Sequence, residues 1–272
     1  MKKSKLNLAA GVSIILLFVI TFYPFFLLIF GSLKNKMQLV NNPWFLTFPL
    51  HFENYSIAFG QIVRPIFNSF VVTFIGIGIT LVASALAAFV IAQLELPGKK
   101  IVYYYIISLL MVPGFVILIP QFLVVRDMHL YDTYLGQVFP PAANNIAMGV
   151  LLMTTFFKGL SKSIMESAKV EGCSNMQMFA RIVLPLSKPI IATVSITTGL
   201  NFWNNYMWPL IITTSKNVSP VIVAVTRLKA NIKLGEGPLF AAYVIASIPI
   251  LLLFAVASEQ FVEGITAGAV KG

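Results

Sequence analysis

Six strongly apolar segments, separated by shorter polar ones, follow one another along the 272-residue chain. The first, residues 11–32, would form about 33 Å of helix at 1.5 Å per residue, and a membrane span needs about 20 apolar residues. We therefore predict an all-α membrane protein with a single transmembrane domain over residues 1–272. Its six transmembrane helices are expected at residues 11–32, 68–92, 101–125, 140–157, 190–212 and 238–258.

The first apolar segment follows three lysines, so a cleaved signal peptide is the alternative to a span. The segment is too long for the apolar core of a signal peptide, and no Ala-x-Ala cleavage site follows it. We interpret it as the first span, in which Pro24 predicts a kink. Six spans place both termini on the same side of the membrane.

A polar island, residues 158–189, separates the fourth and fifth spans and has the pattern of a helix, a turn and a second helix. One face of the first helix is apolar, formed by Ile164, Met165 and Ala168. Gly172 follows this helix, where a helix end needs a residue that tolerates positive φ. Ser174 and Gln177 form a Ser-x-x-Gln capping box that begins the second helix.

The second helix of the island has its own apolar stripe, formed by Met176, Phe179 and Val183. Leu184-Pro185 is expected to end it, because the residue before a proline avoids the α region. Two short helices need a surface to lie against, and the small side chains of Ser167 and Ala168 would let another protein approach closely. The pattern predicts a docking element, and an amphipathic loop on the membrane surface is the alternative.

Composition supports a membrane protein, since 58% of the residues are hydrophobic and 10% are charged, against about 25% charged residues in soluble domains. The net charge of +10 fits loops beside anionic lipid. No cluster of Lys and Arg with interleaved aromatic residues indicates nucleic-acid binding. The single cysteine, Cys173, excludes an intramolecular disulfide, and one cysteine with two distant histidines provides no metal site.

The distribution of basic residues favours cytoplasmic termini. With that orientation, 11 of the 19 Lys and Arg residues lie inside and 8 lie outside, a weak bias in the direction of the positive-inside rule. We therefore expect a multi-pass protein of the cell membrane whose island, like its termini, is cytoplasmic.

Acidic residues are absent from the middle of every predicted span. Carriers coupled to protons or sodium usually place a carboxylate on the ion path, so an ion-coupled secondary carrier is a less favoured alternative. The chain also lacks the Gly-x4-Gly-Lys-Ser/Thr phosphate loop and the Gly-x-Ser-x-Gly nucleophile motif. We expect no catalytic residue and no enzymatic activity, and a source of energy on another chain.

The fifth span carries a polar stripe, formed by Asn201, Asn204, Asn205 and Trp208. Their spacing of i, i+3, i+4 and i+7 predicts one helix face. Carboxamides can hydrogen-bond hydroxyl groups, and an indole can stack on the C–H face of a sugar. The stripe predicts part of a substrate path, with Asn144 and Asn145 of the fourth span and Gln121 of the third as weaker candidates. Hydrogen bonding between helices, together with an interfacial aromatic belt, is the alternative.

The second span carries a stripe of small residues at every fourth position, formed by Gly76, Thr80, Ser84 and Ala88. Small residues let two helix backbones approach closely in lipid. We expect this face to pack against another helix.

The island resembles the EAA loop of ABC-importer permeases, whose pattern is Glu-Ala-Ala, three residues, Gly, nine residues and Ile-x-Leu-Pro. Six residues fall in register, namely Glu166, Ala168, Gly172, Ile182, Leu184 and Pro185. Ser167 departs from the alanine that is usual in the family, although serine is nearly as small. The resemblance implies that these seven residues couple the chain to a cytoplasmic ATPase subunit.

Two further stretches, residues 202–210 and 261–272, are similar to carbohydrate-importer permeases, above all to the smaller permease of maltose-type transporters. The resemblance covers nearly the whole chain and implies a permease subunit that forms half of the translocation path for a sugar or oligosaccharide. The partners that it implies are a second homologous permease, an extracytoplasmic sugar-binding protein facing residues 213–237, and a cytoplasmic ATPase dimer that binds ATP and Mg. A permease for a peptide, an amino acid or phosphate is the alternative, because the EAA loop alone does not select a substrate.

Overall fold

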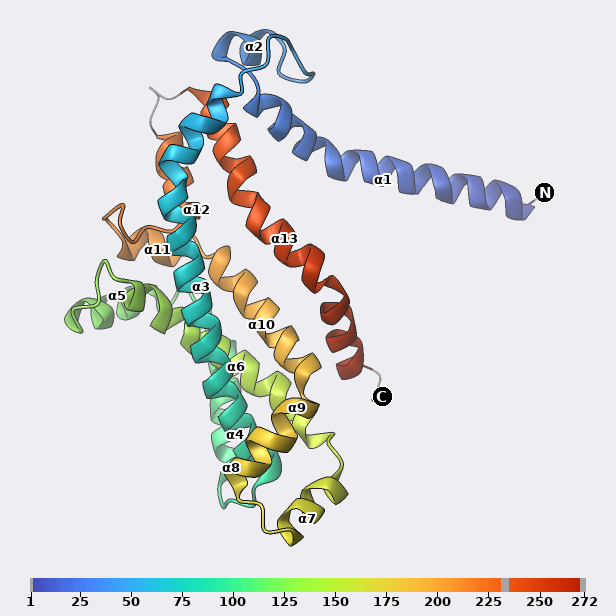
Figure 1. Ribbon diagram of the computed structural model, residues 1–272, viewed down its shortest axis with the longest axis vertical. Helices are drawn as coiled ribbons and strands as arrows, with labels where there is room; N and C mark the ends of the chain where they lie inside the picture. Colours follow the sequence, from blue (N-terminus) through green and yellow to red (C-terminus); the bar gives the residue numbers. More distant parts are fainter. Residues whose placement is uncertain (1, 231–234, 270–272) are drawn as a thin grey trace. The chain divides into compact units, whose positions relative to one another are not determined.

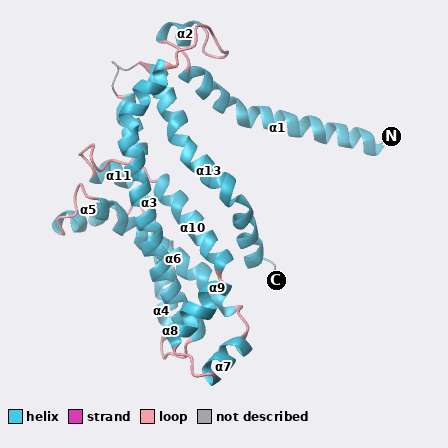
Figure 2. Ribbon diagram, in the orientation of Figure 1, coloured by secondary structure: helices cyan, strands magenta, loops and turns pink. Residues whose placement is uncertain are grey.

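The computed structural model describes residues 2–230 and 235–269, and over these residues every regular element is helical (Figures 1 and 2). The predicted all-α class is therefore confirmed. The last residues of the predicted tail, 270–272, and residues 231–234 of the loop before the sixth span lie outside the described residues. The elements are α1 (Lys2–Ser32), α2 (Lys36–Asn41), α3 (Glu53–Gln93), α4 (Lys99–Ser108), η1 (Leu109–Met111), α5 (Leu118–Asp127), α6 (Tyr134–Lys158), α7 (Lys162–Val170), α8 (Asn175–Met178), η2 (Phe179–Val183), α9 (Leu184–Leu186), α10 (Lys188–Trp203), α11 (Met207–Ile212), α12 (Val221–Lys229) and α13 (Glu236–Ala269).

Within the described residues, three helices are long and apolar enough to cross a membrane, at Gly11–Ser32, Glu53–Gln93 and Glu236–Leu253. A fourth candidate is the bent pair Asn175–Leu186 and Lys188–Trp203, whose axes differ by 79°. These findings fit a membrane protein. The count of six spans stays a prediction.

Two of the predicted spans are broken in the structure. The segment predicted as a helix over 101–125 contains α4, η1 and α5, with irregular backbone at residues 112–117, where Pro113 cannot donate a helical hydrogen bond. The segment predicted over 190–212 ends as α10 at Trp203 and resumes as α11 at Met207. The helices that contain the other four predicted spans begin before the predicted first residue or end after the predicted last residue.

The chain divides into two compact units, residues 1–64 with 223–249, and residues 65–222 with 250–272. In the first unit, the side chain of Lys34 is fully buried just after α1 ends. Its Nζ donates to the backbone oxygens of Asn42, at 2.7 Å, and Pro43, at 3.3 Å. Burial lowers the pKa of Lys34, because desolvation disfavours the ammonium. This lysine holds the segment after α2 against the end of α1.

The second unit is built on helices that approach closely at small residues. All four residues of the stripe on α3 face inward: Thr80, Ser84 and Ala88 are buried, and a Cβ on Gly76 would overlap the ring of Phe202 on α10. Gly149 of α6 lies against the side chain of Ser84. The predicted packing face is therefore confirmed, and it joins α3 to both α6 and α10.

This packing gives a matched pair of variants. Gly76→Ala is expected to destabilise the protein by about 1–3 kcal/mol, because the ring of Phe202 has to move out of a buried position. Gly78→Ala, two residues further along α3, places its Cβ where nothing lies within 4 Å, and alanine is the better helix former by about 0.5–1 kcal/mol. Thermal unfolding of both purified variants in detergent measures the difference, and equal midpoints would contradict the described packing.

In Figure 1 the second unit has two distinct ends. Helices α5 and α11 lie together at one end, where Val125, Trp208 and Ile212 form a small buried cluster. Helices α4, α7 and α8 lie at the other end. The predicted polar stripe therefore reaches the end of this unit where α11 lies, and the predicted coupling island lies at the other end.

Candidate functional site

The island folds as two arms joined by a tight turn at Gly172. The first arm, α7, ends in a Schellman motif in which the N–H of Gly172 donates to Lys169 O and the N–H of Cys173 donates to Ala168 O, both at 3.0 Å. Gly172 has a φ of +78°, the left-handed conformation that this motif requires and that glycine adopts without a steric penalty. The prediction from its position in the sequence is confirmed.

The second arm begins at the capping box that the sequence predicts. The N–H of Gln177 donates to Ser174 Oγ at 3.2 Å, and the N–H of Ser174 donates to Gln177 Oε1 at 2.8 Å. The two bonds satisfy backbone donors that a helix start leaves without partners. The turn between the arms is thus fixed on both sides by local interactions.

The second arm does not end at Leu184-Pro185, which corrects the sequence prediction. It passes from α8 into a π-helical turn, η2, and continues as α9 to Leu186 before bending by 79° into α10. Pro185 is tolerated because it lies in the first turn of α9, where the backbone N–H that proline lacks needs no helical partner. The arm is therefore continuous almost to the start of α10.

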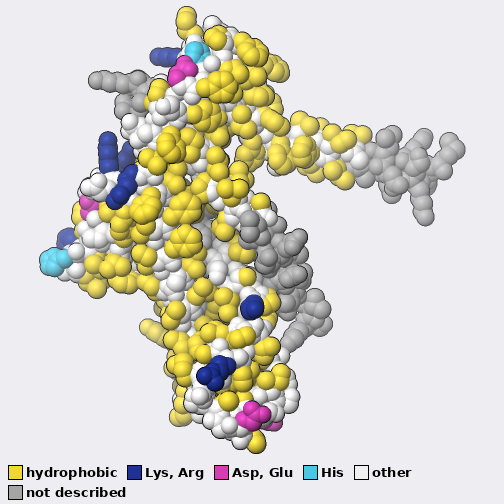
Figure 3. Space-filling view, viewed as in Figure 1, with side chains coloured by type: hydrophobic (Ala, Val, Ile, Leu, Met, Phe, Trp, Pro, Cys, Tyr) yellow, Lys and Arg dark blue, Asp and Glu magenta, His cyan; other side chains and the backbone are white. Residues whose placement is uncertain are grey.

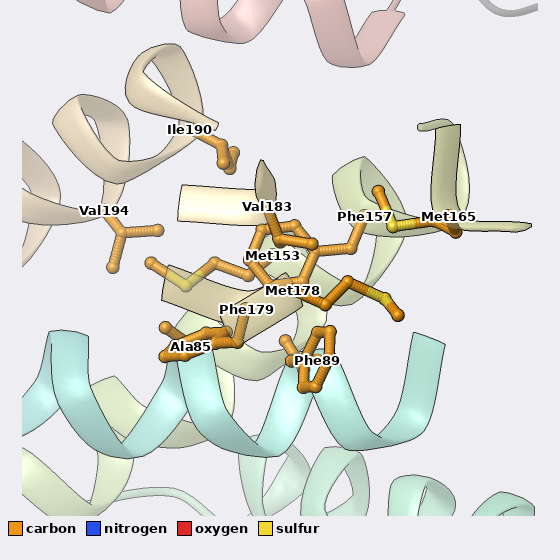
Figure 4. Close-up of a cluster of buried hydrophobic side chains, with 11 residues drawn as sticks. Ala85, Phe89, Met153, Phe157, Met165, Met178, Phe179, Val183, Ile190 and Val194 are labelled. Atoms are coloured by element: carbon orange, nitrogen blue, oxygen red, sulfur yellow. The ribbon is translucent and has the colours of Figure 1, made fainter. Parts of the chain in front are cut away.

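A cluster of buried apolar side chains fixes both arms to helices α3, α6 and α10 (Figure 4). Met165 of α7, with Met178, Phe179 and Val183 of the second arm, lies among residues of α3, α6 and α10. The rings of Phe89 and Phe179 have centroids 5.2 Å apart. Displacing either arm would expose this cluster, so the arms and the helices are expected to move together.

The seven predicted coupling residues separate into two groups. Glu166, Ser167, Gly172 and Pro185 are exposed on the outside of the island. Ala168 is buried, and Ile182 and Leu184 are half-buried against the cluster. The burial of Ala168 with Met165 fits the apolar face predicted for the first arm, and its methyl group lets α7 lie close to its own unit.

The predicted polar stripe is not one helix face. Asn204 is the C-cap of α10, where its N–H donates to Leu200 O at 3.0 Å, and Asn205 lies in the break before α11. Trp208 is buried, and its Nε1 donates to the carbonyl oxygen of Gly136 at 3.0 Å. The indole therefore fastens α11 to α6 and does not point into open space.

Two carboxamides meet between α10 and α6. Asn201 Nδ2 donates to Asn145 Oδ1 at 2.9 Å, and Asn145 Nδ2 donates to Pro141 O at 2.9 Å. Asn145 is buried, whereas Asn144, Asn201 and Asn204 are exposed. The sequence marks Asn145 only as a weaker candidate beside Asn144, and its pairing with Asn201 depends on helix packing.

A polar network that the sequence analysis missed fixes residues 213–221 to the helices of the second unit. Asp132, with a φ of +56°, accepts the N–H groups of Thr214 and Ser215 at 2.9 and 3.0 Å. Asn68 donates to Ser219 O at 2.9 Å and accepts from the Tyr134 hydroxyl at 2.6 Å. These partners are 66 to 151 positions apart, so no local pattern reveals them.

Known proteins resemble the chain along its length. YurM of Bacillus subtilis, an ABC transporter permease protein, is 31% identical over 92% of this chain and 84% of its own length. AraQ of the same organism, an arabinooligosaccharide transport system permease protein, is 29% identical over 98% of this chain and 96% of its own.

A solved structure has the same fold. A chain of a bacterial ABC transporter involved in the import of the acidic polysaccharide alginate superposes with a TM-score of 0.80 at 19% identity, over 96% of this chain and 98% of that one. The family model of the binding-protein-dependent transport system inner membrane component matches residues 82–266, which include both arms of the island. The chain belongs to this family of membrane transport components.

Proposed function

We propose that the chain is one of two permease subunits of an ATP-driven importer and forms half of the path for a sugar or oligosaccharide. The observation that carries this proposal is the island, whose two arms and Gly172 turn match the EAA pattern and are fixed to the transmembrane helices by one buried cluster. The sugar class is supported by the arabinooligosaccharide and alginate systems to which its relatives belong. A permease for another solute is the second candidate, because the island itself does not contact solute.

The proposed topology has six spans, with both termini and the island on the cytoplasmic side of the cell membrane. Helices α1, α3 and α13 supply the three long spans. The remaining three are formed by the region of α4 and α5, by α6, and by α10 with α11. Irregular backbone at residues 112–117 and 204–206 is compatible with a span where protein or a watery cavity supplies hydrogen bonds.

The proposed assembly contains a cytoplasmic ATPase dimer, a second homologous permease and an extracytoplasmic sugar-binding protein. ATP and Mg bind to the ATPase chains and not to this one. The exposed Glu166, Ser167, Gly172 and Pro185 contact the ATPase, and the two half-buried residues of the motif transmit its movement to the cluster. The fixed segment 213–221 faces the sugar-binding protein.

The proposed substrate path runs beside Asn144, Asn201 and Asn204. Exposed carboxamides on otherwise apolar helices are costly against hydrocarbon, which supports a face turned toward the second permease and the solute. Trp208 contributes by positioning α11, since its indole N–H is already bonded.

Asn144→Leu separates the path from helix packing. The side chain of Asn144 forms no hydrogen bond with any residue that the structure describes, so its replacement is not expected to lower the unfolding midpoint. Losing one or two hydrogen bonds to sugar hydroxyls is expected to reduce uptake about tenfold. Asn201→Leu is the comparison, because it breaks the bond to Asn145 and is expected to lower both uptake and stability. Unchanged uptake kinetics for Asn144→Leu across several sugars would contradict the path.

The assembly is tested by purifying the chain from its native membrane in mild detergent and identifying what accompanies it by mass spectrometry. Recovery of an ATPase, a second permease and a binding protein is expected, and that binding protein can be screened against sugars. A chain that is recovered alone, and that moves solute without ATP, would replace the proposal with a secondary carrier.

A further inference from the structure

An apolar groove of about 410 Å³ lies between the second arm of the island and the membrane helices. Four side chains of α3 form one wall, and the remaining lining residues are Met153, Met176, Phe179, Leu184 and Ile191. No polar side chain lines it. Its volume lies within the range of about 300–1,000 Å³ typical of small-molecule sites.

The groove is open and is not filled by the side chains that line it. Met176 and Val82 on its walls are each 63% exposed. Water is a poor occupant of an apolar space, because it finds no hydrogen-bonding partners there. Removing large apolar side chains from water is favourable, so a hydrocarbon occupant would be stabilised by these walls.

Two basic residues belong to the same elements as the groove. In the sequence, Arg181 follows the lining residue Phe179 by two positions and precedes the lining residue Leu184 by three. Lys188 lies one helical turn before Ile191 on the same face of α10. Both are exposed, and neither forms an ion pair with any residue in 2–230 or 235–269. Figure 3 shows basic side chains on this face, over α8 to α10, among apolar ones.

We propose that this groove binds one anionic phospholipid, with an acyl chain along Met176, Phe179 and Ile191 and its phosphate against Arg181 and Lys188. A hydrocarbon chain matches the uniformly apolar lining, and a negative headgroup matches two unpaired positive charges at a membrane surface. The uniform lining and the adjoining charges favour a lipid over an apolar helix of a partner permease, because such a helix would leave both cations without a counter-charge. The inference rests on the proposed cytoplasmic, membrane-surface position of the island.

Binding of a lipid in this groove would make the position of the second arm depend on which lipid is present. The acyl chain would fill space between α3 and the arm, next to the buried cluster that contains Phe179. Anionic lipid is therefore expected to stabilise this arm and neutral lipid to leave its groove open.

The test measures lipid retention by native mass spectrometry of the whole transporter, purified from its membrane and supplied with phosphatidylglycerol or phosphatidylcholine of the same acyl chains. Phosphatidylglycerol is expected to be retained at least tenfold more. The double variant Arg181→Gln with Lys188→Gln is expected to lose this preference. The double variant Lys162→Gln with Lys169→Gln, which removes two exposed cations from the first arm, is the matched control and is expected to keep it.

A second variant tests the groove without changing charge. Val82→Trp places an indole into the open wall and is expected to reduce retention of both lipids while the complex stays assembled. Equal retention of the two lipids by the unaltered transporter, or unchanged preference in the Arg181 and Lys188 double variant, would overturn the proposal. So would a disulfide formed, under an added mild oxidant, between Val82→Cys and a cysteine introduced into the partner permease, because protein would then occupy the groove.

Lipid retention and sugar import are measured separately, so the lipid site and the proposed function can fail independently. A transporter that retains phosphatidylglycerol through Arg181 and Lys188 but imports no sugar supports the lipid site and contradicts the proposed sugar substrate. A transporter that imports sugar with no lipid preference contradicts the lipid site alone.

Discussion

Gly172→Pro is expected to abolish uptake while the protein still inserts into the membrane. Proline fixes φ near −65°, whereas the turn needs +78° at this residue. Proline also removes the N–H that donates to Lys169 O at 3.0 Å. Both losses fall on the turn alone, since nothing lies within 4 Å of a Cβ at this position. The first arm would leave its orientation relative to the second, and the proposed ATPase partner would no longer engage both.

Gly172→Asn is the matched control, because asparagine adopts the left-handed region more readily than other side chains. It keeps the backbone N–H and is expected to retain most of the uptake. The measurement is uptake together with ATP hydrolysis stimulated by the binding protein, in vesicles that contain equal amounts of each variant. Normal uptake in Gly172→Pro would show that coupling does not need this turn. An equal loss of uptake in Gly172→Pro and Gly172→Asn would attribute the loss to side-chain bulk and not to backbone conformation.

Gly136→Ala is expected to be the most destabilising of the small substitutions, by about 3 kcal/mol or more. A Cβ at this position would overlap the backbone carbonyl oxygen of Leu130, which cannot rotate away as a side chain can. The same residue accepts the indole N–H of Trp208 and donates its own N–H to Thr133 Oγ1 at 3.1 Å. Moving it would therefore loosen both the start of α6 and the attachment of α11.

Thermal unfolding of purified Gly136→Ala in detergent, followed by tryptophan fluorescence, measures this effect. Trp208→Phe is the companion variant, because it removes the hydrogen bond to Gly136 and part of the buried ring without adding a Cβ against Leu130, and it is expected to cost about 1–3 kcal/mol. An unchanged unfolding temperature for Gly136→Ala would contradict the close contact described between the backbone of Leu130 and α6.

The parts of the fold that the sequence predicts well are those set by neighbouring residues. The turn at Gly172 and the capping box of Ser174 and Gln177 each involve residues within five positions of one another. The packing stripe on α3 was also predictable, because small residues at every fourth position have few other uses in a membrane helix.

Distant contacts explain what the sequence did not predict. The break after Trp203 interrupts an apolar run that has no proline before Pro209, and the segment beyond it is fixed by a hydrogen bond between residues 72 positions apart. The directions of two side chains were also predicted wrongly. Ile164 and Met176, assigned to the apolar faces of the two arms, are exposed, since apolar residues of a membrane protein are not obliged to face inward.

The π-helical turn at Phe179–Val183 carries one residue more than a regular helical turn would need. Such a turn absorbs the extra residue, so the helical segments on its two sides keep their orientation. Deleting one residue within it would restore the α-helical repeat and leave Leu184 against the cluster, whereas a deletion in a regular turn of the arm would rotate everything beyond it by about 100°. Among relatives of this protein, changes in length by one residue are therefore expected within Phe179–Val183 and not in the regular turns beside it.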